Sequence, residues 1–154
     1  MAGNTDKRLT ELGIVLPTPN PPAANYVPVV VTGNYLYVSG QLPLGPEGMT
    51  LTGTLGAGVE VEAAQAAARL CAINVLAQVK VALGDLDRVV RLVKVVGFVA
   101  SDFSFGDQPK VVNGASDLFV EVLGDRGRHA RSAVGVAALP FGAAVEVEAI
   151  FEIA

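Results

Sequence analysis

The stretch Gly124–Ala154, GDRGRHARSAVGVAALPFGAAVEVEAIFEIA, contains the features on which the fold prediction depends. Its apolar run from Arg131 to Leu139 predicts a buried strand, and Pro140 with the following Phe-Gly pair predicts a short turn. A second strand is expected from 143 to 153, because from Val145 onward apolar residues alternate with a set that is acidic except for Ile150, which gives one apolar and one acidic face. The stretch is therefore expected to form a β-hairpin.

The same stretch concentrates side chains that could bind or react with a ligand. Arg131 opens the first strand and is followed by small residues, so open space is expected beside a fixed guanidinium. Such a group suits bidentate capture of a ligand carboxylate. The residue types alone favour the ordinary alternative, an ion pair with an acid of this chain, because most arginines are surface or ion-pair residues. Three carboxylates share one face of the second strand: Glu146, Glu148 and Glu152.

The chain length and the cysteine content limit the architecture. A chain of 154 residues is expected to form a single domain, residues 1–154, with residues 1–22 as a proline-rich N-terminal lead-in. One cysteine and one histidine leave no disulfide framework and no Cys- or His-based metal site, so we expect no metal site of these kinds. Cys71, in the middle of a helical pattern, is expected to be a buried structural thiol.

The composition favours self-association over binding to nucleic acid or membrane. Hydrophobic residues make up 51% and charged residues 17% of the chain, an apolar surplus that suggests subunit interfaces. We find no unbroken apolar run of about 18 residues and no leader pattern, so a cytoplasmic location without membrane contact is expected. A net charge of -4 counts against binding to nucleic-acid phosphates.

Two helices and five strands are expected in the order strand, strand, helix, strand, helix, strand, strand. Besides the two strands of the final stretch, strands are expected over 26–31, 35–41 and 89–99. Helices are expected over 60–83 and from Asp107, as the cap, to Gly124, and a short additional helix over 5–12, capped by Thr5, precedes these elements. This order predicts an α+β fold with both helices on one face of a mixed sheet. The other, apolar face is expected to contact further subunits in a closed cyclic assembly.

Several short motifs carry a resemblance to a known family over nearly the whole chain. They are Ala24 to Pro28 (ANYVP), Tyr37 to Pro43 (YVSGQLP), Val112 to Ser116 (VNGAS), Arg131-Ser132, Leu139-Pro140 and Glu146 to Glu148 (EVE), in this order. Together they resemble the YjgF/RidA family, also labelled endoribonuclease L-PSP, and its subgroup of slightly longer YjgF-like members. The resemblance implies a chorismate mutase-like fold and a homotrimer with clefts between subunits.

The resemblance also implies an activity and a set of site residues. Well-understood members hydrolyse reactive enamines and imines, such as 2-aminoacrylate, to 2-keto acids and ammonia. By motif, Arg131 would bind the substrate carboxylate and Glu146 would position the water, without metal or organic cofactor. The other residues implied for the pocket are Tyr26, Gly40 and Asn113, with Ala133 in the position of a family cysteine. Pro28 replaces a common glutamine, so two pocket contacts differ. With the resemblance included, ligand binding is the preferred role for Arg131.

The expected hairpin separates Arg131 from Glu146. Across a tight turn Glu146 would lie opposite about Ala137, roughly 20 Å along the strand from Arg131. One small ligand could not contact both residues of one chain, so the site is expected to be completed by a second subunit, unless the loop is longer than it looks.

Three other functions remain open at this level. A trimer that binds small carboxylates without catalysis agrees with the two altered pocket positions, ribonuclease activity is implied only by the family label, and chorismate mutase activity only by the fold name. His129 is a candidate acid or base, but it could equally stabilise helix-terminal carbonyls or gate the cleft. Ser39 and Ser132 are poor nucleophile candidates.

Overall fold

A five-stranded mixed sheet forms the centre of the computed structural model, which describes residues 3–154. The strand order is β1-β2-β7-β5-β6, and β5 and β6 are the one parallel pair in it. The strands are β1 (Val29–Thr32), β2 (Tyr35–Gln41), β5 (Val89–Ala100), β6 (Ala130–Val136) and β7 (Val145–Ile153), and β3 (Leu44–Gly45) with β4 (Gly48–Met49) forms a small separate hairpin. This is the α+β fold with a mixed sheet that the sequence predicts.

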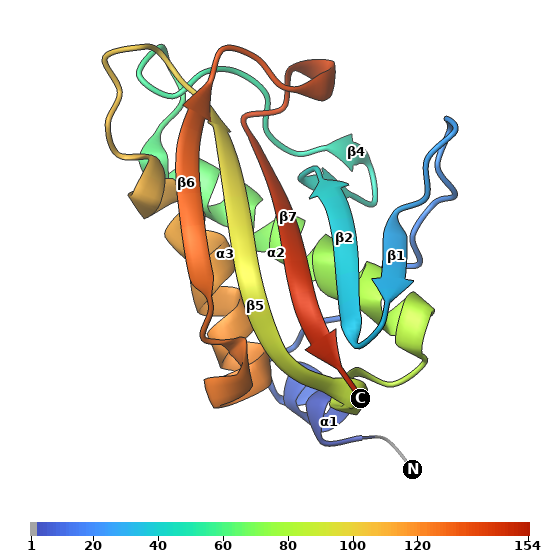
Figure 1. The fold of residues 1–154 in the computed structure, drawn as a ribbon. Coiled ribbons are helices and arrows are strands. Elements are labelled where there is room, and N and C mark those ends of the chain that lie inside the picture. The colour runs from blue at the N-terminus through green and yellow to red at the C-terminus, as the bar shows by residue number, and fades with distance from the viewer. Residues whose placement is uncertain (1–2) are drawn as a thin grey trace.

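Two long helices, α2 (Val61–Leu83) and α3 (Gln108–Leu123), pack together behind one face of this sheet (Figure 1). Each ends at a glycine with positive φ, Gly84 at 75° and Gly124 at 64°, a conformation that costs glycine little. By length and composition α2 could also span a bilayer, but 56% of its apolar window is buried inside the fold. Its apolar character is therefore explained by its position in the core, where it packs against both the sheet and α3.

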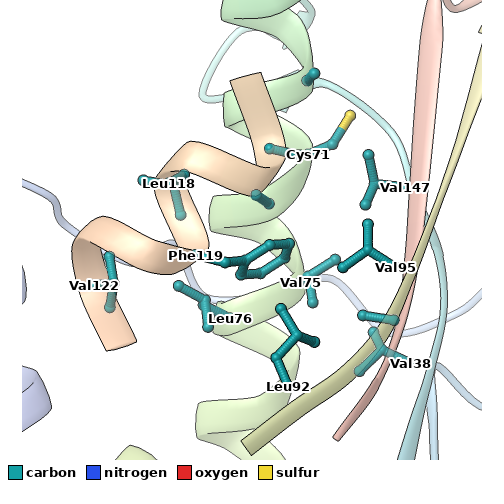
Figure 2. Close-up of a cluster of buried hydrophobic side chains, with 14 of the residues drawn as sticks. Val38, Cys71, Val75, Leu76, Leu92, Val95, Leu118, Phe119, Val122 and Val147 are labelled. Carbon is teal, nitrogen blue, oxygen red and sulfur yellow. The ribbon is translucent and has the colours of Figure 1, made fainter. Parts of the chain in front are cut away.

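The core fills the layer between the sheet and the helices. Phe119 of α3 points into it and lies among Val75 and Leu76 of α2 and Leu92 and Val95 of β5 (Figure 2). Phe119 is fully buried and meets Phe151 of β7 edge to face. On β7 the odd-numbered residues from 145 to 153 are buried and the even-numbered ones are half-buried, so the predicted alternation of this strand is confirmed.

The predicted hairpin of the last two strands is wrong. β6 pairs in parallel with β5 on one side, while β7 pairs antiparallel with β5 on the other side and with β2. The connection crosses the end of β5 and contains the short helical turn η3 (Pro140–Gly142) instead of a tight β-turn. Gly142 O accepts from Gly53 N, which ties this crossing to another loop. β6 ends at Val136, three residues before the predicted end at Leu139.

The predicted cap of the first helix at Thr5 is also wrong. The first helix, α1 (Asn4–Glu11), begins one residue early, and Thr5 Oγ1 donates to Asp87 instead of capping its own helix. The Asp87 carboxylate, from the short turn η1 (Leu86–Arg88), accepts the backbone N–H groups of Asn4 at 2.7 Å and Thr5 at 2.9 Å. Asp107 occupies the cap position of α3, but its side chain makes no capping hydrogen bond. The predicted strand at 26–31 begins only at Val29.

Candidate functional site

Arg131 is held by one face of α3. Its Nη1 donates to Asn113 Oδ1 at 2.8 Å and to Ser116 Oγ at 3.2 Å, and its Nη2 donates to Pro109 O at 3.4 Å. Pro109, Asn113 and Ser116 are spaced by four and three residues, so the helix presents them on one side. We call Arg131, Asn113, Ser116 and His129 the arginine half-site.

These contacts leave part of the Arg131 guanidinium free to bind a ligand. A guanidinium has five N–H donors, of which three are used, so Nε–H and one Nη2–H have no acceptor within residues 3–154. Nε and Nη2 are neighbours in the guanidinium plane and match the two oxygens of a carboxylate. No acidic side chain in the described part of the chain pairs with Arg131 at 4.0 Å or less, so the ion pair favoured by residue type alone is not formed.

His129 joins the arginine half-site through Ser116. Its Nε2 lies 2.9 Å from Ser116 Oγ, its Nδ1 lies 2.6 Å from Gly127 O, and its ring meets Phe119 edge to face at 6.1 Å. Burial lowers the pKa of His129 below its ordinary value; the bond to Gly127 O opposes this change and the charge of Arg131 adds to it. His129 is therefore neutral at pH 7, and it contacts a helix-side hydroxyl rather than lying free in a loop.

Glu146 forms a second group with Gly40 on β2. The pairing of β2 with β7 shifts between Val38 and Gln41, so β2 bulges by one residue at this point. A Cβ atom at Gly40 would overlap Glu146 Oε1, which means that the carboxyl lies directly against the glycine backbone. Burial, and secondly the charge of Glu148, raise the pKa of Glu146 above its ordinary value.

Tyr26 and Ala133 complete the predicted set. Tyr26 is 57% exposed and lies two residues before Pro28, whose carbonyl accepts from Ser39 N next to Gly40. The segment that carries Tyr26 is thus tied to β2 beside Gly40, and we call Glu146, Gly40 and Tyr26 the glutamate half-site. Ala133 follows Arg131 by two residues on β6 and packs against the core, on the same side of the sheet as Arg131.

The two half-sites lie apart in one chain. Arg131 is level with Val95 of β5, and Glu146 is level with Phe98 on the other side of that strand. Three residues along the sheet and two strand spacings across it separate their Cα atoms by about 14 Å, not the 20 Å expected from a hairpin. Their side chains also leave opposite faces, because Arg131 meets α3 whereas Glu146 alternates with the buried residues of β7.

Within residues 3–154 no helix covers the face of the sheet that carries Glu146 (Figure 1). It contains a depression of about 250 Å³ bordered by apolar and charged side chains, among them Val30, Tyr37, Lys94, Val96, Glu148 and Ile150. Tyr37 is 44% and Val30 50% exposed. Within residues 3–154 no group of three or more His, Cys, Asp or Glu side chains is placed to hold a metal ion. The uncovered face is thus a large, partly apolar surface beside the glutamate half-site.

Sequence reasoning missed the roles of two residues of the arginine half-site. Ser116 ends the VNGAS motif, and its spacing from Asn113 places both residues on one side of a helix, which is the signal that could have found it. For His129, the predicted contact with a helix-terminal carbonyl is present at Gly127 O, the end of a short helical turn, whereas its contact with Ser116 is not predicted. No local signal indicates the pairing of residue 116 with residue 129, since it depends on the packing of β6 against α3.

Comparison with known proteins identifies the relatives of this chain. Residues 6–152 match the family described as "YjgF/chorismate_mutase-like, putative endoribonuclease". Protein TCP17 of Trypanosoma cruzi is 55% identical over 153 residues, which cover 99% of this chain and 96% of that protein. The crystal structure of Atu1372, a protein of unknown function from Agrobacterium tumefaciens, superposes with a TM-score of 0.91 at 54% identity and covers 97% of this chain and 93% of that chain.

A more distant structure adds information on ligands. TdcF of E. coli, solved with bound serine, is 28% identical, has a TM-score of 0.62, and the match covers 89% of this chain and 94% of that chain. The family match over most of the chain, together with these full-length similarities, agrees with the strand order and the motif positions described above. The chain belongs to the YjgF/RidA family.

Proposed function

We propose that this protein is a hydrolytic deaminase of small enamines and imines that carry a carboxylate, with a 2-keto acid and ammonia as products. The observation that carries the proposal is the pair of free donors on Arg131, which is held in place by α3 and lacks an acidic partner in the described chain. A small carboxylate fits these donors. The serine bound to the relative TdcF, itself a small amino acid, supports the same ligand class.

Glu146 is the proposed proton carrier. For 2-aminoacrylate, the carboxyl of Glu146 gives a proton to the terminal carbon as the nitrogen lone pair forms the C=N bond of the imine. Water then adds to the carbon of the C=N bond while the Glu146 carboxylate accepts a proton from it. Return of this proton to nitrogen expels ammonia as the new hydroxyl group gives its proton to Glu146, which leaves pyruvate and restores the Glu146 carboxyl. A carboxyl whose pKa is raised by burial suits this alternation of acid and base near neutral pH.

The site is proposed to form between protomers of a homotrimer. One chain places Arg131 and Glu146 about 14 Å apart on opposite faces of the sheet, farther than one small ligand reaches. β6 is one of the two edge strands, so a second protomer whose uncovered sheet face approaches this edge could bring its Glu146 to the free donors of Arg131. The exposed apolar side chains of the uncovered face support such an interface.

Ammonia release from 2-aminoacrylate generated in solution tests the activity. Arg131→Ala should abolish release above the buffer rate, because the carboxylate loses its bidentate partner. Arg128→Ala is a matched control: Arg128 is only three residues away, but its side chain is 71% exposed and reaches Asp125 instead of α3. Equal release from both variants, or no release from the folded wild type, would reject the proposal for this substrate.

Mixed oligomers test the shared site. When Arg131→Ala and Glu146→Gln chains are unfolded and refolded together, about a quarter of the sites in randomly assembled trimers receive an intact Arg131 from one protomer and an intact Glu146 from its neighbour. Activity should therefore return to roughly a quarter of the wild-type value. Mixtures that remain as inactive as either parent would show that one chain supplies both residues.

A non-catalytic binder of small carboxylates is the second candidate. Ala133 favours it, because an alanine packed on the core offers no thiol to a ligand. In that case pyruvate should raise the melting temperature in an Arg131-dependent manner while ammonia release stays at the buffer rate. The endoribonuclease in the description of the family has less support here, since the chain has a net charge of -4.

A further inference from the structure

We propose that Ser116 and His129 are positioning residues that fix the Arg131 guanidinium, through a chain of hydrogen bonds that starts at the carbonyl of Gly127. The proposal rests on the proposed function, in which Arg131 binds a substrate carboxylate. It assigns to the single histidine of the chain a role in anion binding rather than in acid-base catalysis.

The donor and acceptor types of these groups fix the direction of every hydrogen bond in the series from Gly127 O to Arg131. Gly127 O can only accept, so His129 Nδ1 at 2.6 Å carries a proton and donates. In the neutral ring Nε2 is then an acceptor, and the Ser116 hydroxyl at 2.9 Å donates to it. The hydroxyl oxygen of Ser116 is left with lone pairs that accept from Arg131 Nη1 at 3.2 Å. Each proton in the series has one acceptor, and the series ends on the guanidinium.

The fold holds Gly127 and His129, which begin this series of hydrogen bonds, close to α3. A Cβ atom at Gly127 would overlap Phe119 O, so only glycine lets η2 (Gly124–Gly127) lie against the helix at this point. The ring of Phe119 packs on the imidazole at an interplanar angle of 81°. Ser116 lies one turn before Phe119 and one turn after Asn113, so a single side of α3 contacts both His129 and Arg131.

Loss of the Nε2 acceptor should weaken ligand binding without touching the proton carrier. A Ser116 hydroxyl without this acceptor is free to rotate, and its oxygen no longer faces Nη1 in one orientation. Arg131 then keeps Asn113 and the long contact to Pro109 O, and the guanidinium must be ordered by the ligand itself. The hydrogen bonds of Ser116 and His129 run to each other, to Gly127 O and to Arg131 and leave the Glu146 carboxyl unchanged, so the rate of the chemical step should change little.

Two substitutions at residue 129 distinguish the role of Nε2 from the role of Nδ1. A glutamine reaches as far as Nε2 and can accept from Ser116 through its amide oxygen, whereas an asparagine reaches only as far as Nδ1 and can bond Gly127 O alone. His129→Asn should therefore raise the Kd for pyruvate and the KM by about 5- to 10-fold with kcat little changed, and His129→Gln should stay near the wild type. Ser116→Ala should resemble His129→Asn, and Ser116→Thr, which keeps the hydroxyl, should bind normally.

Calorimetric titration with pyruvate measures Kd whether or not the protein turns over, and thermal melting shows that each variant is folded. Weakened binding in both His129→Asn and Ser116→Ala, with retention in Gln and Thr, supports the positioning chain. Wild-type affinity in all four variants while Arg131→Ala abolishes binding would overturn it and leave the proposed function intact. Unchanged pyruvate binding in Arg131→Ala itself would overturn both.

Discussion

Gly40→Ala offers a test of the glutamate half-site that needs no change to an ionisable residue. The added methyl group would overlap Glu146 Oε1, and ordinary contact begins near 3.4 Å, so the carboxyl must move by at least about 1 Å. A displacement of this size at a reacting group costs on the order of 100-fold in rate. Because the atom that must move is the end of a flexible side chain, stability should change by less than about 1 kcal/mol.

Two other glycines serve as controls for this substitution. A Cβ at Gly106 would meet nothing within 4 Å, so Gly106→Ala should retain both activity and stability. At Gly97 of β5 it would overlap Val112, a fully buried side chain of α3, so Gly97→Ala should cost about 1–3 kcal/mol. The assay is kcat for ammonia release combined with the free energy of unfolding in urea. The expected pattern is lost activity at residue 40, lost stability at residue 97 and neither at residue 106.

A double variant shows whether Gly40 acts through Glu146 alone. If it does, Gly40→Ala combined with Glu146→Gln should be no slower than Glu146→Gln by itself, because the first substitution has nothing left to displace. Additive losses would mean that the glycine backbone contacts the substrate independently. A Gly40→Ala variant with wild-type kcat would refute the placement of Glu146 as proton carrier.

Two further predictions concern stability and its dependence on pH. Asp87→Ala should cost about 1 kcal/mol and lower the melting temperature by about 2–4 °C at pH 7, because α1 loses its cap. Hydrogen bonds from the Thr5 hydroxyl, Thr5 N and Asn4 N, followed by the charge of Arg126, lower the pKa of Asp87. The stabilisation by Asp87 is therefore present above about pH 4 and disappears as the pH falls through the lowered pKa of the folded state. A difference in melting temperature between Asp87→Ala and the wild type that stays constant down to about pH 2 would contradict this. Glu146→Gln should melt higher than the wild type at pH 8 and equally at pH 4, because burial raises the pKa of the folded carboxyl and its ionisation opposes folding as pH rises. Equal melting temperatures at pH 8 would contradict the burial of this charge.

Local sequence patterns predicted where the helices and strands lie better than they predicted which strands pair with one another. Alternation along 145–153 and the glycines that end α2 and α3 depend on contacts within a few residues, and these predictions are confirmed. The hairpin prediction failed because alternation shows which face of a strand is buried but not which strand lies beside it. β6 pairs with β5 through the intervening α3, a contact between segments about 35 residues apart.

The predicted cap at Thr5 failed for a related reason. Thr5 has a hydroxyl that could cap its own helix, but the carboxylate of Asp87, 82 residues further along, binds both the hydroxyl and the backbone N–H of Thr5. A charged acceptor forms stronger hydrogen bonds than a neutral hydroxyl, and the fold brings it to the helix N-terminus. Such competition is invisible in the local sequence. The same holds for His129, whose partner Ser116 belongs to another element.

The inference that two protomers share the site depends on the separation of Arg131 from Glu146, which the hairpin prediction described wrongly. The hairpin placed the two residues at different heights on neighbouring strands, whereas β5 lies between their strands. The distance falls from about 20 to about 14 Å, but the residues now also lie on opposite faces. A closer pair on one face could be joined by a shift of side chains, whereas no rotamer carries Glu146 through a packed sheet. The corrected pairing therefore strengthens the inference that a second protomer completes the site.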